Sequence, residues 1–291
     1  MALAAVDGME NALRLEEQRS ASLLGALRAG QGLALHEGSY RVPQSTLVRD
    51  ALTAVYFYRA ENRVEGTQER ASKLIETIRQ IVDDSAAIAS PVELEAMEAA
   101  LHRAEMLNAA APAMKIEAAS LSKSPHPAKE IAYAKNVTVL AFYAPWSPQR
   151  KQMFELLASM GRDYKTFPVQ IFAVCTAGIA TGDATAKPAE VLANLLEEFG
   201  KAGAPATVVV APEASTKDFA VNDWPMFAVV DPAGTVRFLD TLSSPEYKDG
   251  GRMHRLVAAL ASQAGPLPQP PAAKKSRRVF VPQEKLERRP K

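Results

Sequence analysis

The sequence is poor in the residues that bind metals or form disulfides. It contains one cysteine, Cys175, in 291 residues, which excludes an intramolecular disulfide and any metal site built from several thiolates. The four histidines lie far apart, and no two have the spacing of a metal-binding pair: His36, His102, His126 and His254. We therefore expect neither a metal ion nor a cofactor.

Long hydrophobic runs and a strong overall charge are also missing. No apolar stretch approaches the roughly 20 residues that a membrane-spanning helix needs. The formal net charge is +1, so the chain as a whole has no bias toward nucleic acid or acidic partners. The first residues, MALAAVDGMENALRLEEQ, lack the basic start and apolar core of a signal peptide, which favours the cytoplasm if this start is native.

Residues 1–111 have apolar residues at helical spacing and predict an all-α helical bundle domain. One helix is expected over about 10–29, ending at Gly30, and a second from about residue 45. The inward positions of the second are Leu47, Ala51, Val55 and Tyr58. A third helix after Gly66 places apolar residues on one face: Ala71, Leu74, Ile75, Ile78, Ile81 and Val82. The fourth begins at Ser90-Pro91-Val92-Glu93, which combines a capping serine, a first-turn proline and a capping-box glutamate.

Residues 136–264 alternate between strand and helix patterns and predict an α/β domain with a mixed sheet. Strands are expected at 137–143, 169–175 and 206–211, and a hairpin at 226–239 around Asp231-Pro-Ala-Gly234. Helices are expected at 149–160, at 188–199 with Gly200 as its stop, and at 253–264. Residues 112–135 are interpreted as a linker, and residues 265–291 as an extended, basic, proline-rich tail.

The bend after the first strand holds no reactive group. A strand that runs into a helix N-terminus is a common place for a nucleophile, because the exposed N–H groups and the helix dipole favour an anion there. Here the bend reads Trp146-Ser-Pro-Gln-Arg150. We expect Ser147 to be the helix N-cap and Pro148 to occupy the first helical position.

The order of elements, the bend and the pair Trp224-Pro225 resemble the thioredoxin fold. More narrowly, they resemble the TlpA/ResA-type thiol–disulfide oxidoreductases, an AhpC/TSA-like group of bacterial envelopes whose motif is W-C-P-P-C-[RK]. Trp146, Pro148 and Lys151 match the tryptophan, the first proline and the basic residue of that motif. The resemblance implies that Pro225 is a cis-proline facing the bend, and it favours the periplasm as the location.

The departures from that motif concern the groups that carry its chemistry. Ser147 replaces the attacking cysteine, Arg150 replaces the resolving cysteine, and Ala141 stands where thioredoxins keep a buried acid. Disulfide exchange requires a thiolate, which a serine hydroxyl does not replace at neutral pH. We therefore expect no catalytic residue at the bend.

Two residues offer alternatives to an inactive site. Cys175 ends a predicted core strand and is expected to act as a small hydrophobic residue, but an accessible Cys175 would support an oxidoreductase or peroxidase. Ser147 would need a histidine and an acid to act as a nucleophile, and the best candidate histidine, His254 on the C-terminal helix, has no evident acid partner in the sequence. An enzyme in the helical region is the third class, and no motif supports it.

The degenerate groove is the first candidate binding surface. It comprises Trp146, Ser147, Pro148, Gln149, Arg150, Trp224 and Pro225. The resemblance accounts for Trp146 as a packing residue, whereas Trp224 is the candidate for an exposed aromatic anchor.

The tail is the second candidate surface. Residues 273–291 carry eight basic and two acidic residues, a net charge of +6 that leaves −5 for the rest of the chain. Such an arm is typical of a segment that docks on an acidic surface, and Arg277, Arg278 and Phe280 are its candidate contacts. A protein partner is favoured, an anionic membrane surface is an alternative, and nucleic acid is the weakest because no aromatics interleave the charges. The sequence thus predicts a non-catalytic thioredoxin-like protein that binds or scaffolds other proteins.

Overall fold

The computed structural model describes residues 66–85, 89–121, 124–125, 129–241 and 251–265. It also describes five single residues nearer the N-terminus, namely Gln18, Gly25, Val48, Leu52 and Val55. Most of the two helices predicted before residue 60 lies outside these residues. So does the tail beyond Gly265, with Arg277, Arg278 and Phe280.

The two described N-terminal helices follow the predicted pattern. Helix α3, Thr67–Ser85, buries the stripe Ala71, Ile75, Ile78, Ile81 and Val82. Helix α4, Pro91–Met106, begins at the predicted cap, where the Ser90 side chain accepts a hydrogen bond from the Glu93 N–H at 3.3 Å. Val48, Leu52 and Val55 are helical and pack into the same core. Val55 was predicted to face inward, and the other two belong to the same face; Leu47 and Ala51 lie outside the described residues.

A seven-stranded mixed sheet forms the centre of the protein, in the order β2-β1-β5-β4-β3-β6-β7. Strands β3 (Val137–Phe142), β4 (Val169–Cys175) and β5 (Thr207–Val210) are parallel to one another. Strands β6 (Met226–Val230) and β7 (Val236–Thr241) form the predicted hairpin, with β6 antiparallel to β3. The parallel strands β3 and β4, with the antiparallel hairpin β6–β7 beside β3, have the arrangement of the thioredoxin fold.

The predicted linker contributes two strands to this sheet, so the interpretation of 118–125 as a linker is wrong. Strand β1, Ala118–Leu121, pairs antiparallel with β5, and the short strand β2, Ser124–Pro125, extends the sheet beyond it. The sequence Ala-Ala-Ser-Leu has neither the β-branched residues nor the alternation that indicates a strand. Its structure is decided by the open edge of β5, whose backbone groups need partners.

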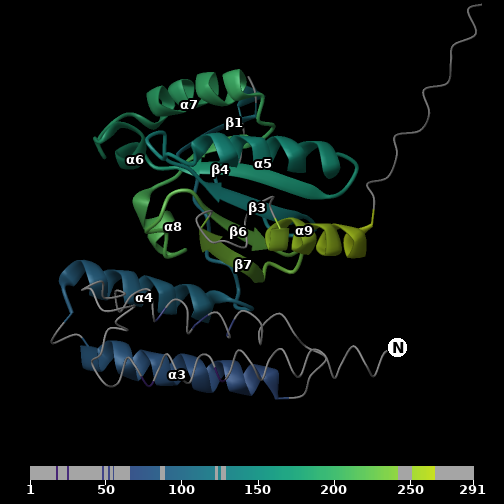
Figure 1. Ribbon diagram of the computed structural model, residues 1–291. Helices are drawn as coiled ribbons and strands as arrows, with labels where there is room; N and C mark the ends of the chain where they lie inside the picture. The colour runs from purple at the N-terminus through teal and green to yellow at the C-terminus, as the bar shows by residue number, and fades with distance from the viewer. Residues whose placement is uncertain are drawn as a thin grey trace, which may run out of the picture.

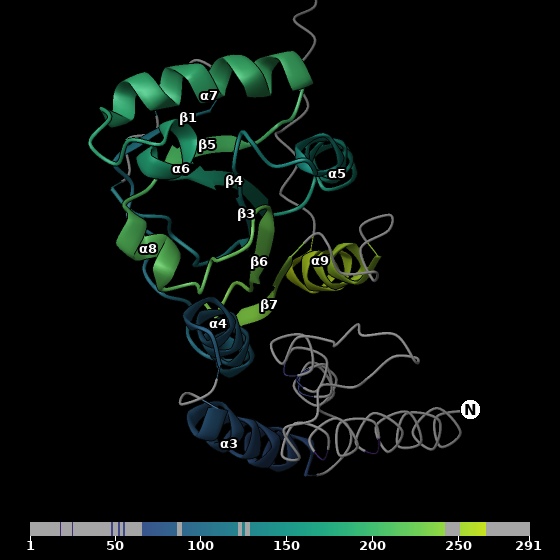
Figure 2. The same ribbon diagram turned by 60° about the vertical axis from the view of Figure 1, so that its left-hand side comes forward.

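Helices cover both faces of the sheet (Figures 1 and 2). One core lies between the sheet and helices α5 (Arg150–Asp163), α7 (Pro188–Ala202) and α9 (Gly251–Ala264). The opposite core includes the end of α4, Met114, Ile131 and Phe219, the last of which follows the short helix α8 (Glu213–Lys217). A second short helix, α6 (Ala177–Thr181), follows β4. The bend between β3 and α5 therefore sits at the carboxyl end of a strand that is buried on both faces.

Helix α7 runs past its predicted stop. Gly200 lies inside the helix, and Gly203 ends it with the left-handed conformation (φ 64°), where its N–H bonds to the Gly200 carbonyl at 3.3 Å. A glycine adopts this conformation without a steric penalty. Gly203, and not Gly200, therefore ends the helix, and the extra residues keep Phe199 and Glu198 within regular helix.

The end of α4 is joined to the sheet. The Asn108 N–H donates to the Val236 carbonyl at 2.8 Å, and the Val236 N–H donates to the Ala109 carbonyl at 2.9 Å, which covers the start of the outer edge of β7. On α4 itself, the buried Arg103 donates to the Ala220 carbonyl at 3.3 Å and to Asn222 Oδ1 at 2.5 Å. Helix α4 thereby supports the loop that leads to Trp224.

Candidate functional site

The bend after β3 is a closed turn, and the prediction that Ser147 caps α5 is wrong. The helix begins at Arg150, with Gln149 as a cap residue that makes no side-chain capping bond. Ser147 is buried, and its hydroxyl donates to the Trp224 carbonyl at 2.9 Å and accepts from the Gln149 N–H at 3.3 Å. The Ser147 carbonyl accepts from the Arg150 N–H at 3.2 Å, which closes the turn before the helix starts. The hydroxyl is thus used to tie the bend to another loop.

That other loop carries the predicted cis-proline. The Trp224–Pro225 peptide bond is cis, and the bond from Ser147 to the Trp224 carbonyl brings the loop into contact with the bend. Both parts of the prediction for this pair are confirmed. The loop is also held from behind by Arg103, through Ala220, whose φ is 50°, and Asn222.

The exposures of the two tryptophans are the reverse of those predicted. Trp146, at the apex of the bend, is 62% exposed. Trp224 is half-buried and packs against the core that contains Met114 and Phe219. The difference arises because the turn at Ser147 points the preceding side chain outward, whereas Trp224 precedes a strand whose residues are all buried. Of the two tryptophans, Trp146 is therefore the one available to a partner.

Arg150 occupies the position of a resolving cysteine but serves as a brace. Its Nη1 donates to the Pro145 carbonyl at 2.8 Å and lies 3.6 Å from the Glu198 carboxylate on α7. Its side chain is 54% exposed, so this ion pair alone contributes little stability. Sequence reasoning missed Glu198, because nothing in the pattern of α7 indicates which residue of a distant bend it meets.

An aromatic cluster supports the bend from below. Tyr143, the residue after β3, packs against Phe199 with ring centroids 5.2 Å apart, and Phe154 packs against Phe199 at 4.8 Å, both edge-to-face. The Tyr143 hydroxyl is buried and has no hydrogen-bond partner within 3.5 Å among the described residues. Burial raises the pKa of Tyr143 well above its usual range, and the nearby Glu198 carboxylate adds to the rise, so the phenol stays neutral.

Cys175 belongs to the same buried region. It ends β4, is 1% exposed and packs in the core under α5 and α7. Burial raises the pKa of its thiol to about 12, and the Glu198 carboxylate adds to the rise. A thiol that is protonated and covered is a poor nucleophile, which agrees with the expectation that Cys175 acts as a small hydrophobic residue.

We expect Cys175 to react with a thiol reagent only when the protein unfolds. With a pKa of about 12, roughly one thiol in ten thousand is ionised at pH 8. The measurement is a thiol titration at pH 8 with and without denaturant, in which the denatured chain should react completely and the native chain should be masked. A rapid reaction of the native thiol would favour the alternative of redox chemistry at Cys175.

His254 has an acid partner after all, but far from Ser147. Its Nε2 lies 3.2 Å from Asp163 Oδ2, and its Nδ1 lies 3.0 Å from the Tyr164 hydroxyl. Asp163 is the last residue of α5, whereas Ser147 lies just before the first residue of that helix. His254 and Ser147 are therefore separated by about the length of α5, roughly 20 Å. The residues of a serine triad are not brought together.

The described residues contain neither a metal-binding cluster nor a membrane-spanning helix. Among them, no group of three or more His, Cys, Asp or Glu side chains is arranged to hold a metal ion. No helix in the described ranges combines the length and the hydropathy of a membrane span.

Comparisons with known proteins extend only to the fold. No protein-family model matches the chain, and no curated protein matches it. Several solved structures match about half of the chain. A secreted Mycobacterium tuberculosis disulfide oxidoreductase homologous to E. coli DsbE is 16% identical, with a TM-score of 0.36, over 52% of this chain and 96% of that one. A thioredoxin-family thiol:disulfide interchange protein from Chlorobium tepidum is 13% identical, with a TM-score of 0.37, over 53% and 96%. A thioredoxin-like protein from Aeropyrum pernix is 16% identical, with a TM-score of 0.37, over 51% and 89%. The assignment of a thioredoxin-like fold rests on the strand order, the parallel crossovers and the cis-proline.

Proposed function

We propose that the protein is a non-catalytic thioredoxin-like module that binds a protein partner at the bend. The observation that carries this proposal is the combination of an exposed Trp146 with a bend that has no thiol. Ser147 and Arg150, at the positions of the two cysteines, hold the bend to its neighbours. A rigid bend with an aromatic side chain in solvent is a suitable anchor for a protein interface.

The binding surface in this proposal is centred on Trp146. Pro148, Gln149 and Arg150 flank it and are exposed or half-buried. Trp224 and Pro225 form the wall beside it, and Ser147 fixes the wall to the bend. The basic tail residues Arg277 and Arg278 are proposed to add an electrostatic contact that weakens with salt. The opposing alternative, an oxidoreductase acting through Cys175, requires a thiol that solvent reaches.

Replacing Trp146 by alanine should weaken partner binding by a factor of about 30, which corresponds to about 2 kcal/mol for an aromatic anchor. The thermal midpoint should remain nearly unchanged, because this side chain is 62% exposed and supports no core. The measurement is quantitative affinity capture from a cell extract, with the intact chain and the variant immobilised at equal density.

The matched control is Val92→Ala, which removes another exposed hydrophobic side chain (78%) from α4. The control should retain the same proteins as the parent chain. If Trp146→Ala also retains them at the same salt tolerance, the bend is not the binding surface and the proposal fails.

A further inference from the structure

The sheet has a notch where β5 stops pairing with β4. Their register pairs Phe172 with Thr207, so two positions nearer the start of both strands Pro205 would lie beside Gln170. Proline has no N–H to donate, and it therefore cannot continue the ladder. Instead, Pro205 packs against Gly161 of α5, where a Cβ on that glycine would lie 2.2 Å from the proline ring. The first residues of β4 thus extend beyond the end of β5.

Two backbone groups of β4 are left facing the notch. On the β3 side, the Val137 N–H donates to the Pro168 carbonyl. On the β5 side, the Ala211 N–H donates to the Cys175 carbonyl. The backbone groups of even-numbered residues along β4 therefore point to β3, and those of odd-numbered residues point to β5. By this alternation the Val169 carbonyl and the Ile171 N–H point to the β5 side. Neither is bonded to a backbone group of any other residue that the structure describes. One acceptor and one donor, two residues apart, are what an added strand needs.

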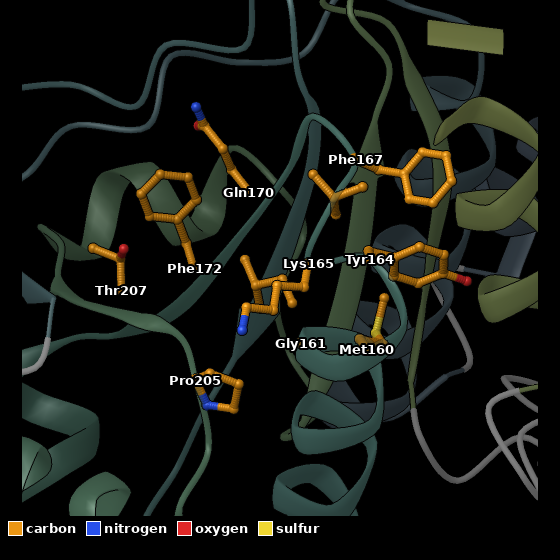
Figure 3. Close-up of a pocket in the computed structure, with 11 residues that line it drawn as sticks. Met160, Gly161, Tyr164, Lys165, Phe167, Gln170, Phe172, Pro205 and Thr207 are labelled. Atoms are coloured by element: carbon orange, nitrogen blue, oxygen red, sulfur yellow. The ribbon is translucent and has the colours of Figure 1, made fainter. Parts of the chain in front are cut away.

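An open pocket of about 420 Å³, lined by both apolar and polar side chains, adjoins these groups (Figure 3). Met160, Tyr164 and Phe167, from α5 and the loop after it, line one side, and Pro205 and Thr207 line the other. Val169, Gln170 and Ile171 are each half-buried and form its floor. The volume lies within the range of small ligand sites and admits an aromatic side chain.

We infer that residues 279–282 of this chain, Val-Phe-Val-Pro, dock in the notch as an added strand, with Phe280 in the cavity. The described chain ends at Gly265, just beyond α9, and His254 of α9 bonds to Tyr164 of the cavity wall. Figure 1 shows the end of α9 on the same side of the molecule as the loop between α5 and β4. The end of the described chain and the proposed docking site therefore lie on the same side of the molecule.

The length and sequence of the segment fit this docking. The distance from His254 to the end of α9 is about 15 Å, and the 13 residues from 266 to 278 span up to about 43 Å when extended. Val279 and Val281 flank Phe280 with strand-forming side chains, and Pro282 prevents the added strand from continuing. Being tethered, the segment acts at a high effective concentration.

The test is amide hydrogen exchange at Ile171 in the full-length chain. In the parent protein the docked segment accepts a hydrogen bond from this N–H, so Phe280→Asp, which removes the apolar anchor, should speed its exchange about tenfold or more. Leu286→Asp is the matched control, because it places the same charge in the tail outside the docked segment, and its exchange should equal that of the parent. Both changes lie in the tail, so neither disturbs the folded core.

Two results would overturn the inference. Equal exchange at Ile171 in the parent and in Phe280→Asp would mean that nothing from the tail occupies the notch. Protection that increases with protein concentration would mean that the occupant is the tail of a second copy. If protection is intramolecular, a partner that takes up Phe280 must first displace it from this edge.

Discussion

A chain carrying Ser147→Cys and Arg150→Cys is expected to form a disulfide between the two new cysteines, whereas the parent chain should show no dithiol-dependent reduction of insulin. The hydrogen bond of 3.2 Å from the Arg150 N–H to the Ser147 carbonyl closes a four-residue turn, which keeps the end Cα atoms within about 7 Å. A disulfide requires a Cα separation of about 4.4–6.8 Å. The measurement is the loss of two hydrogens by intact mass after mild oxidation, followed by peptide mapping.

The matched control for this pair is Ser147→Cys with Glu155→Cys. Glu155 is also exposed on α5 but lies five residues beyond Arg150, about 7.5 Å further along the helix axis. This pair should not close within one molecule. If the 147/150 pair also stays reduced, the bend does not have the geometry of the motif it resembles. The backbone of the bend, and not only its missing thiols, would then prevent a disulfide.

Phe199→Ala is expected to have the largest effect on stability, lowering the free energy of unfolding by about 3–5 kcal/mol. Phe199 is 3% exposed and contacts the rings of Tyr143 and Phe154, so its removal leaves a cavity between α7, the end of β3 and α5. The measurement is equilibrium denaturation followed by far-ultraviolet circular dichroism. The same cavity should make Cys175, which packs in that core, react faster with thiol reagents in the native state.

Asn194→Ala is the control on the same helix, because Asn194 faces solvent and contributes to no core. Its effect should be within about 0.5 kcal/mol, as for most surface substitutions. A small effect of Phe199→Ala would show that the bend is supported mainly by β3 and the Trp224 loop, and that the aromatic cluster is not its foundation.

The lack of disulfide exchange at the bend could be predicted from the sequence, because this chemistry depends on which residues are present. A thiol that is not encoded cannot be supplied by packing, so Ser147 and Arg150 exclude disulfide exchange at this position whatever the fold. The contact between the bend and the cis-proline was also predictable. Both segments carry the residues of a known motif, and the motif fixes their relative position through the strands that precede and follow them.

The sequence by itself determined the elements whose signals are local. The alternation or continuous burial of apolar residues placed β3, β4 and the β6–β7 hairpin, and the Ser90 cap placed α4, since these depend on neighbouring residues only. Tertiary structure alone decided the rest. Ala118–Leu121 became a strand because β5 offered an open edge, and the hydroxyl of Ser147 met the Trp224 loop instead of its own helix. Trp146 was left in solvent, and Pro205 opened a notch beside β4. Each of these outcomes depends on a partner distant in the chain, and local propensity carries no information about that partner.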